Sequence, residues 1–402
     1  MKILYFGDSP LITTGLAQVS RTIVNALCHD HEVEIIAMNH WPEQHLEAED
    51  LPYKIHPCVS ANYRNVESAK EAILKADYDM FIYSADVGFD DIFLWLDEAR
   101  QKRDIFVVGY VPVDCDCIHG SAFNCLELCN CIITYTEHGK RVISKYKPHL
   151  ADRINVIPLV CEPEKFFPLD ASSRLNLRKE LFGIDDDTFL VGCIARNQPR
   201  KDLGRLLMLF HEYHSTHPNS ALYIHSAQND LGGSLVQTAQ SVGIEIGKEV
   251  MFASHAHDVC QGMPTSWLNC LYNCFDVLVS TSTGEGWGLP TTEAMSAKCP
   301  VMVPGNTANI EIVGENEERG FLVETGGDIS HQQILYGLVN YPRDIVHTDS
   351  FLLSLDYIQS YPEIARLRAK KALEWCSTNT FGKIASRWTK LADAVSKLGV
   401  SS

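Results

Sequence analysis

A glycine-rich stretch in the second half of the chain constrains the fold more than any other feature. Residues 282–295 have the sequence STGEGWGLPTTEAM and directly follow an apolar run at 276–281. An apolar run of this length predicts a buried strand, and the glycines and proline after it predict a turn that leads into a helix. The stretch therefore predicts a strand–loop–helix junction in an α/β sheet.

The residue types at this junction suit a phosphorylated ligand that carries hydroxyl groups. The three glycines of the turn would let the backbone approach a ligand. A helix beginning near Thr291 would present unpaired N–H groups to an anion. Glu285 lies in the loop and Glu293 in the first turn of the helix, where each carboxylate can accept hydrogen bonds. Phosphate beside a polyol is the chemistry of a nucleotide-sugar. A polar loop whose second glutamate only caps its own helix is the alternative.

Length and composition predict a protein of two domains without a membrane segment. The 402 residues exceed the usual size of a single core. An apolar content of 46% with 21% charged residues is ordinary for a globular protein. No apolar run approaches the roughly 20 residues that span a bilayer. The first apolar run, at residues 3–6, is too short for a signal peptide, so we expect a cytoplasmic protein.

Net charge and cysteine content narrow the possible partners. The formal charge of −17 argues against a broad nucleic-acid-binding face, although it leaves a local groove open. Fourteen cysteines without secretory context predict reduced thiols. Around His119 they cluster at Cys115, Cys117, Cys125, Cys129 and Cys131, which could form a zinc site. Buried thiols are the favoured interpretation, because Cys131 begins a predicted strand and the pair Cys125 and Cys129 falls on one face of a predicted helix.

Apolar runs alternate with helical patterns along two halves of the chain. Strands are expected at 2–7, 33–38, 78–85, 105–113, 131–136 and 154–159, then at 189–195, 221–226, 249–254, 276–281, 300–303 and 320–323. A proline-marked break near 160–170 separates the halves. Alternation of this kind predicts parallel sheets covered by helices, that is, two Rossmann-like domains. Ligands in such sheets bind at the carboxyl ends of the strands.

The spacing of Glu285, seven intervening residues and Glu293 resembles the signature of the retaining family-4 glycosyltransferases of GT-B fold. The resemblance implies an α/β architecture with two Rossmann-like domains facing a central cleft. Residues 1–162 would form the acceptor domain, with a final helix at 382–402 packing back onto it, and residues 163–381 the donor domain. The amino-acid sequences of residues 196–202 and 284–290 are most similar to a branch of these transferases found in viral and bacterial genomes.

The same resemblance assigns roles around the donor. Arg196, and Lys201 five residues on, match the family's diphosphate-binding pair, and two fixed cations would stabilise the charge that develops on a departing diphosphate. Arg200 between them is expected to be a surface charge. Glu293 would hold the ribose, and Glu285 would orient the sugar. The remaining donor-binding residues implied are Gly15, Gly286, Trp287, Gly288, Leu289 and His255.

Other positions have two interpretations each. Asp114 stands where many family members have a histidine or a His-Asp pair that touches the sugar, and His119 is the competing candidate. Thr136 resembles a residue near the cleft in relatives, but helix capping is equally consistent with its position. Glu311 matches a further family glutamate and is expected to be structural. His255 and His257 lack a third ligand, so no metal is expected there.

The resemblance thus implies a retaining hexosyl- or pentosyltransferase that moves a sugar from a nucleotide-diphosphate sugar, UDP-linked by preference, to a hydroxyl acceptor. No Ser–His–Asp or Cys–His arrangement is evident in the sequence, which agrees with a mechanism that needs no protein nucleophile. Neither a cofactor nor a metal is expected. The acceptor could be a small molecule, a glycan, a lipid or a hydroxymethylated DNA base. A sugar-nucleotide epimerase and a non-catalytic nucleotide-sugar-binding protein are the alternatives.

Overall fold

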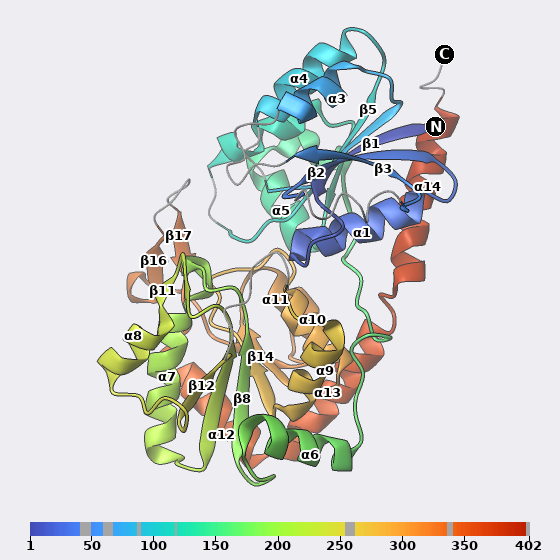
Figure 1. The fold of residues 1–402 in the computed structure, drawn as a ribbon. Coiled ribbons are helices and arrows are strands. Elements are labelled where there is room, and N and C mark those ends of the chain that lie inside the picture. The colour runs from blue at the N-terminus through green and yellow to red at the C-terminus, as the bar shows by residue number, and fades with distance from the viewer. Residues whose placement is uncertain are drawn as a thin grey trace.

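The chain folds around two parallel sheets that occupy separate lobes (Figure 1). The computed structural model describes residues 1–40, 50–58, 67–86, 90–116, 119–253, 262–335 and 341–398. The first lobe contains a seven-stranded sheet of order β3-β2-β1-β4-β5-β6-β7. The second contains a six-stranded sheet of order β12-β9-β8-β13-β14-β15. Both sheets are built from parallel pairs, as strand–helix alternation predicts.

The first lobe takes most of its elements from the first 156 residues. Its strands are β1 Lys2–Asp8, β2 Glu32–Met38, β3 Lys54–Cys58, β4 Met80–Tyr83, β5 Phe106–Val111, β6 Cys131–Thr134 and β7 Ile154–Val156. Its helices are α1 Gly15–Leu27, α3 Glu67–Leu74, α4 Asp90–Arg100 and α5 Glu137–Tyr146, with 3-10 turns η2 Gly120–Leu128 and η3 Pro148–Arg153.

The second lobe adds two short antiparallel hairpins to its parallel sheet. The sheet strands are β8 Phe189–Ile194, β9 Ser220–His225, β12 Val250–Phe252, β13 Val277–Val279, β14 Val301–Pro304 and β15 Phe321–Val323. The hairpins pair β10 Asn229–Asp230 with β11 Gly233–Ser234, and β16 Gln332–Ile334 with β17 Pro342–Asp344. The helices are α6 Ala171–Phe182, α7 Leu203–Thr216, α8 Leu235–Val242, α9 Thr265–Cys274, α10 Leu289–Ser296, α11 Thr307–Val313, α12 Thr348–Ser360 and α13 Pro362–Cys376, with turns η4 Pro199–Lys201 and η5 Ile329–His331.

Each expected strand is present, although most are shorter than the apolar run that predicted them. The strand β3 was not expected. It lies at the edge of the first sheet and includes Pro57, a residue that strands tolerate mainly at edges because it donates no backbone hydrogen bond. The two hairpins were also not expected, since strands of two or three residues leave almost no alternating pattern.

The final helix joins the two lobes. α14, Phe381–Lys397, follows α13 of the second lobe and packs against α1 of the first (Figure 1). Its Trp388 is buried and meets the ring of Tyr110 on β5 edge-on, with ring centroids 4.9 Å apart. Tyr110 in turn donates a hydrogen bond to the carbonyl of Ile157 at 2.8 Å. One apolar cluster therefore runs from the first sheet through α14 into the second lobe.

Replacing Trp388 with alanine should lower the free energy of unfolding by about 3–5 kcal/mol, because it removes a buried indole and leaves a cavity between α14 and β5. Urea unfolding followed by circular dichroism measures the loss. Lys390→Ala, on an exposed position of the same helix, is the control and should change little. Equal stability of the two variants would show that α14 does not anchor the first lobe.

Candidate active site

The carboxyl ends of β8 and β13 bring together the residues that follow them. The turn η4 comes after β8, and residues 280–288 come after β13. The backbone N–H of Thr283 donates to the carbonyl of Arg200 at 2.8 Å, and the Thr281 hydroxyl donates to the carbonyl of Lys201 at 3.0 Å. These bonds hold η4 against the glycine-rich loop, so two basic residues lie beside Glu285.

Glu285 is a buried carboxylate held by two cations. Its Oε2 accepts a hydrogen bond from Arg200 Nη1 at 2.9 Å, and its Oε1 pairs with Lys201 Nζ. Burial would raise the pKa of Glu285, but the charges of Arg200 and Lys201 outweigh it and lower the pKa to about 2. Burial lowers the pKa of Lys201, and the Glu285 charge opposes that shift. The site is thus a compact charge cluster that excludes most solvent.

The prediction that Arg200 is a surface charge was wrong. Besides Glu285, its Nη1 donates to the carbonyl of Gly284 at 3.0 Å, and its Nε lies 3.8 Å from Asp114 Oδ2 in the other lobe. Arg200 and Lys201 are adjacent in a tight 3-10 turn, which directs both side chains at the same carboxylate. Arg200 therefore belongs to the charge cluster and connects it to the first lobe.

The glycines of the loop allow close contact between the two lobes, in addition to any contact that they make with a ligand. A β-carbon at position 284 would lie 2.0 Å from the carbonyl oxygen of Asp114, and one at position 286 would lie 2.7 Å from Cβ of Pro112. Only glycine permits so close an approach. Gly288 has a φ of +104°, which favours glycine for a conformational reason, and it stands immediately before α10. The loop after β5 therefore packs directly on the glycine-rich loop.

Asp114 is held by an arginine that the sequence did not indicate. Arg343 on β17 donates from Nη1 to the Asp114 carbonyl at 2.6 Å and from Nη2 to Oδ1 at 3.2 Å. Together with Arg200, it surrounds Asp114 with positive charge from the second lobe. The two partners are 229 residues apart in the chain, so no local pattern could have paired them.

Glu293 lies in the first turns of α10, as predicted, but in a different environment from Glu285. Its Oε2 accepts a hydrogen bond from Tyr272 Oη at 2.6 Å, and Tyr272 is buried on α9. Burial raises the pKa of Glu293 to about 7, although the Tyr272 hydrogen bond lowers it in part. Tyr272 is a second residue that the motif did not reveal, since nothing near it in sequence marks it. Its phenol therefore orients one oxygen of Glu293.

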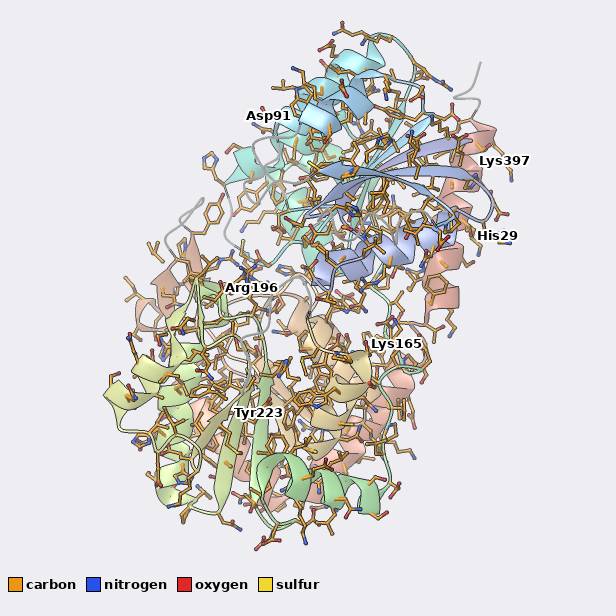
Figure 2. All side chains as sticks on the ribbon, in the orientation of Figure 1. His29, Asp91, Lys165, Arg196, Tyr223 and Lys397 are labelled. Atoms are coloured by element: carbon orange, nitrogen blue, oxygen red, sulfur yellow. The ribbon has the colours of Figure 1, made fainter. Side chains whose placement is uncertain are left out.

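Arg196 follows β8 at the border between the lobes, where Figure 2 labels it. Its guanidinium donates from Nε to Asp230 Oδ2 at 2.8 Å, and it is roughly half exposed. Asp230 belongs to the unexpected hairpin β10–β11. Arg196 thus stands on the same edge of the sheet as Lys201, with its charge directed at Asp230 in this state.

Four further predicted residues have structural contacts. His119 caps η2, where its Nδ1 accepts from the backbone of Ser121 at 3.3 Å. Thr136 caps α5 through a hydrogen bond from Gly139 N at 3.2 Å. Trp287 is buried with its indole stacked on Trp375, and Leu289 approaches Gly15 across the lobe boundary. Any contact of Trp287 with a ligand would therefore come from its backbone, whereas the Leu289 side chain is only half-buried.

Glu311 has the structural role that was expected. Its Oε2 accepts a hydrogen bond from the backbone N–H of Glu137 at 2.8 Å, so it caps α5 of the first lobe from α11 of the second. His255 and His257 lie outside the described residues. Cys117 also lies outside them, and the described cysteines of its cluster are buried free thiols. Within the described part of the chain, no group of three potential metal ligands is present.

Comparison with known proteins gives one family match and several structures of similar fold. Residues 177–334, most of the second lobe, match the family model of glycosyl transferases group 1. No curated protein sequence matches the chain. Three solved structures cover nearly all of it: HepE of Anabaena in complex with UDP (TM-score 0.73, 15% identity, 98% of this chain and 100% of that one), sucrose-phosphate synthase of Thermosynechococcus elongatus (0.72, 15%, 99% and 100%), and the lipopolysaccharide-biosynthesis glycosyltransferase WaaG (0.66, 13%, 98% and 99%).

The family match and the shared fold support a glycosyltransferase of GT-B fold. The predicted fold class, two Rossmann-like α/β domains, is confirmed by these structures. At such low identities the structural likeness establishes the fold alone. Within the described residues, none of the helices combines the length and apolar character that a bilayer span requires.

The raised pKa of Glu293 predicts how stability depends on pH without any ligand. The folded protein retains a proton that an unfolded glutamate releases near pH ~4.3. The free energy of unfolding should therefore fall as pH rises from that value to about 7 and change no further through this group. Glu293→Gln removes the effect, so the Tm difference between variant and wild type should grow over this range. A constant difference across pH would contradict the raised pKa.

Proposed function

We propose that the protein is a retaining glycosyltransferase that transfers a sugar from a UDP-sugar to a hydroxyl acceptor. The observation that carries the proposal is the cluster of Glu285, Arg200 and Lys201 at the carboxyl ends of two adjacent strands, directly before α10. Cations, loop amides and a helix N-terminus meet there, which is the arrangement that holds a diphosphate. The match of residues 177–334 to a glycosyltransferase family supports the same assignment.

The donor would occupy this edge of the second lobe. Lys201 and Arg196 would bind the diphosphate, which requires Lys201 to exchange its contact with Glu285 for a phosphate oxygen. Glu285, with the loop amides of residues 286–288, would orient the sugar. Glu293, positioned by Tyr272, would accept hydrogen bonds from the ribose. UDP is the preferred nucleotide because HepE, which shares the fold, has been crystallised with UDP.

Transfer would take place on one face of the sugar. The acceptor oxygen forms a bond to the anomeric carbon as the bond from that carbon to the β-phosphate oxygen breaks, and the acceptor proton passes to the departing phosphate. The protein contributes no covalent intermediate; its cations stabilise the charge on the leaving diphosphate. Contact between Gly284 and Asp114 keeps the two lobes together around the reacting groups, which limits access of water. Free thiols throughout the described residues favour a reducing, cytoplasmic location.

Lys201→Ala should reduce kcat by roughly 10²- to 10³-fold, because one cation is lost from the leaving group. Glu293→Ala should mainly weaken nucleotide binding. Release of UDP from UDP-glucose, with and without acceptor, measures both. Lys179→Ala, an exposed lysine on α6, is the matched control and should retain full activity. Normal turnover in Lys201→Ala and Glu293→Ala would exclude this site as the donor site.

A thermal-shift series with UDP, GDP, ADP and their glucose conjugates identifies the nucleotide. A ligand at about 100 times its Kd adds roughly 2.7 kcal/mol of stability, so the bound base should raise Tm clearly above the others. UDP is expected to give the largest shift. Consumption of the donor separates the alternatives: formation of an altered free sugar nucleotide indicates an epimerase, and binding without consumption indicates a nucleotide-sugar sensor.

Donor turnover should not require a divalent metal. Lys201 and Arg196 would supply the positive charge that a metal provides in other transferases. Activity after treatment with EDTA is therefore expected to equal that of the untreated enzyme. A loss that Mg²⁺ or Mn²⁺ restores would show that the proposed cations are insufficient.

A further inference from the structure

The edge of the first lobe that faces the donor lobe is acidic. Asp8 ends β1, and Asp86 follows β4, the neighbouring strand. The two strands are in register from Ile3 with Met80 to Phe6 with Tyr83, and Ser84 N donates to the Phe6 carbonyl at 2.8 Å. The parallel register therefore brings both carboxylates to the same end of the sheet. Asp86 is accessible to solvent, while Asp8 is buried.

Neither carboxylate has a salt-bridge partner among the described residues. Asp8 accepts hydrogen bonds from the Thr14 hydroxyl at 2.5 Å and the Asn39 amide at 3.2 Å, both uncharged groups. Within the described residues no salt bridge reaches Asp8 or Asp86, whereas nearby Asp114 has two arginine partners. Although the Asp86 side chain reaches solvent, the surrounding protein removes part of its hydration, and this and the charge of Asp114 raise the pKa of Asp86 to about 6, with Arg200 offsetting the shift in part. Asp86 is therefore mostly ionised at pH 7.5.

Two buried hydroxyls beside these carboxylates make no hydrogen bond of good geometry among the described side chains. The Ser84 hydroxyl and the Tyr135 phenol are 1% and 4% exposed, and Ser84 lies close enough to interact with the phenols of Tyr135 and Tyr5. Tyr135 lies just beyond the end of β6, where burial, the Tyr5 phenol and the charges of Asp86 and Asp8 raise its pKa. Buried hydroxyls are nearly always satisfied by protein, water or ligand. The unused hydrogen-bonding capacity of these two hydroxyls lies beside two carboxylates, which can accept hydrogen bonds from hydroxyl or amine groups.

We infer that Asp8 and Asp86, with Ser84 and Tyr135, form an acceptor subsite that selects an uncharged or amine-bearing alcohol over an anionic one. The inference rests on the proposed function and specifies its acceptor class. Asp86, the accessible carboxylate, accepts a hydrogen bond from the acceptor and orients its reacting hydroxyl toward the donor. It is a positioning residue in this role, since the proton still leaves with the diphosphate.

The electrostatics argue against phosphorylated acceptors, including DNA. An anionic group brought beside Asp8 and Asp86 meets like charge at short range in a partly desolvated site, where screening by salt is weak. Arg200, whose charge acts on Asp86, and Arg343 beside Asp114 already pair with Glu285 and Asp114. A polyanion would have to displace those pairs before gaining any cation. A neutral polyol or an amine gains hydrogen bonds from the same carboxylates without that penalty.

Small alcohols of different charge test the inference before the natural acceptor is known. Glycerol, ethanolamine and glycolate, at equal concentration near pH 7.5, each compete with water for the sugar of UDP-glucose, or of the donor that the thermal-shift series identifies. The alcohol oxygen replaces the diphosphate on the anomeric carbon, and UDP and a proton are released. Mass spectrometry quantifies each glycoside relative to free glucose. We expect ethanolamine and glycerol to be captured roughly tenfold more efficiently than glycolate.

Asp86→Asn should reduce this preference to about threefold or less while leaving UDP affinity unchanged, because the variant removes one charge from the acceptor side alone. Asp91→Asn is the control. Asp91 is exposed on α4 of the same lobe, far from the donor lobe in Figure 2, and the preference should stay as in wild type. Rescue of the preference in Asp86→Glu would show that charge, and not shape, is responsible.

The failures of the two proposals are distinguishable. If wild type neither binds a nucleotide nor consumes a nucleotide-sugar, the proposed function itself is wrong. If it consumes the donor but captures glycolate as well as ethanolamine, the subsite is wrong and the function stands. The subsite is likewise wrong if none of the three alcohols is captured, or if Asp86→Asn preserves the wild-type preference.

Discussion

The buried charge of Glu285 organises the structure around the candidate site. A carboxylate removed from water is costly unless cations and hydrogen bonds compensate it. Arg200 and Lys201 provide both, and to do so they must follow β8 in a tight turn that packs on the loop after β13. The two strand ends therefore cannot separate without exposing an unpaired charge. A diphosphate bound here, as proposed, would meet cations already removed from most of the solvent, and Lys201 would exchange its contact with Glu285 for a phosphate oxygen.

The same cluster extends across the lobe boundary. Asp114 of the first lobe approaches Gly284 so closely that no side chain fits between them, and Arg343 and Arg200 hold it from the other side. Glu311 adds a second link by capping α5 from the donor lobe. These polar contacts are separate from the apolar anchor at Trp388, which lies on the helix that returns to the first lobe. The lobes are thus joined by polar contacts at the site and by a separate apolar contact at Trp388.

The parts of the structure that sequence predicted are those with a local signal. Buried parallel strands leave continuous apolar runs, and the junction at 282–295 has glycines and a proline at fixed offsets, so the sheets and the positions of Glu285 and Glu293 followed directly. Arg200, Arg343 and Tyr272 did not, because their roles depend on partners far away in sequence. Arg200 could have been suspected, since a residue adjacent to Lys201 in a short turn shares its surroundings. The edge strand β3 contains a proline and few apolar residues, so periodicity carried no signal there.

The two glutamates of the motif show how environment divides chemical roles within eight residues. Glu285 is surrounded by cations, stays ionised at any physiological pH, and suits the orientation of a sugar whose hydroxyls donate to it. Glu293 is buried and accepts a hydrogen bond from a neutral phenol, and its pKa near 7 lets it be either charged or neutral. A neutral Glu293 costs less to bury than an ionised one. Ribose hydroxyls that donate to it would favour the ionised form, so nucleotide binding itself should draw the proton out. The donor would then complete its own site, because the carboxylate that binds it becomes fully charged only when ribose hydroxyls donate to it.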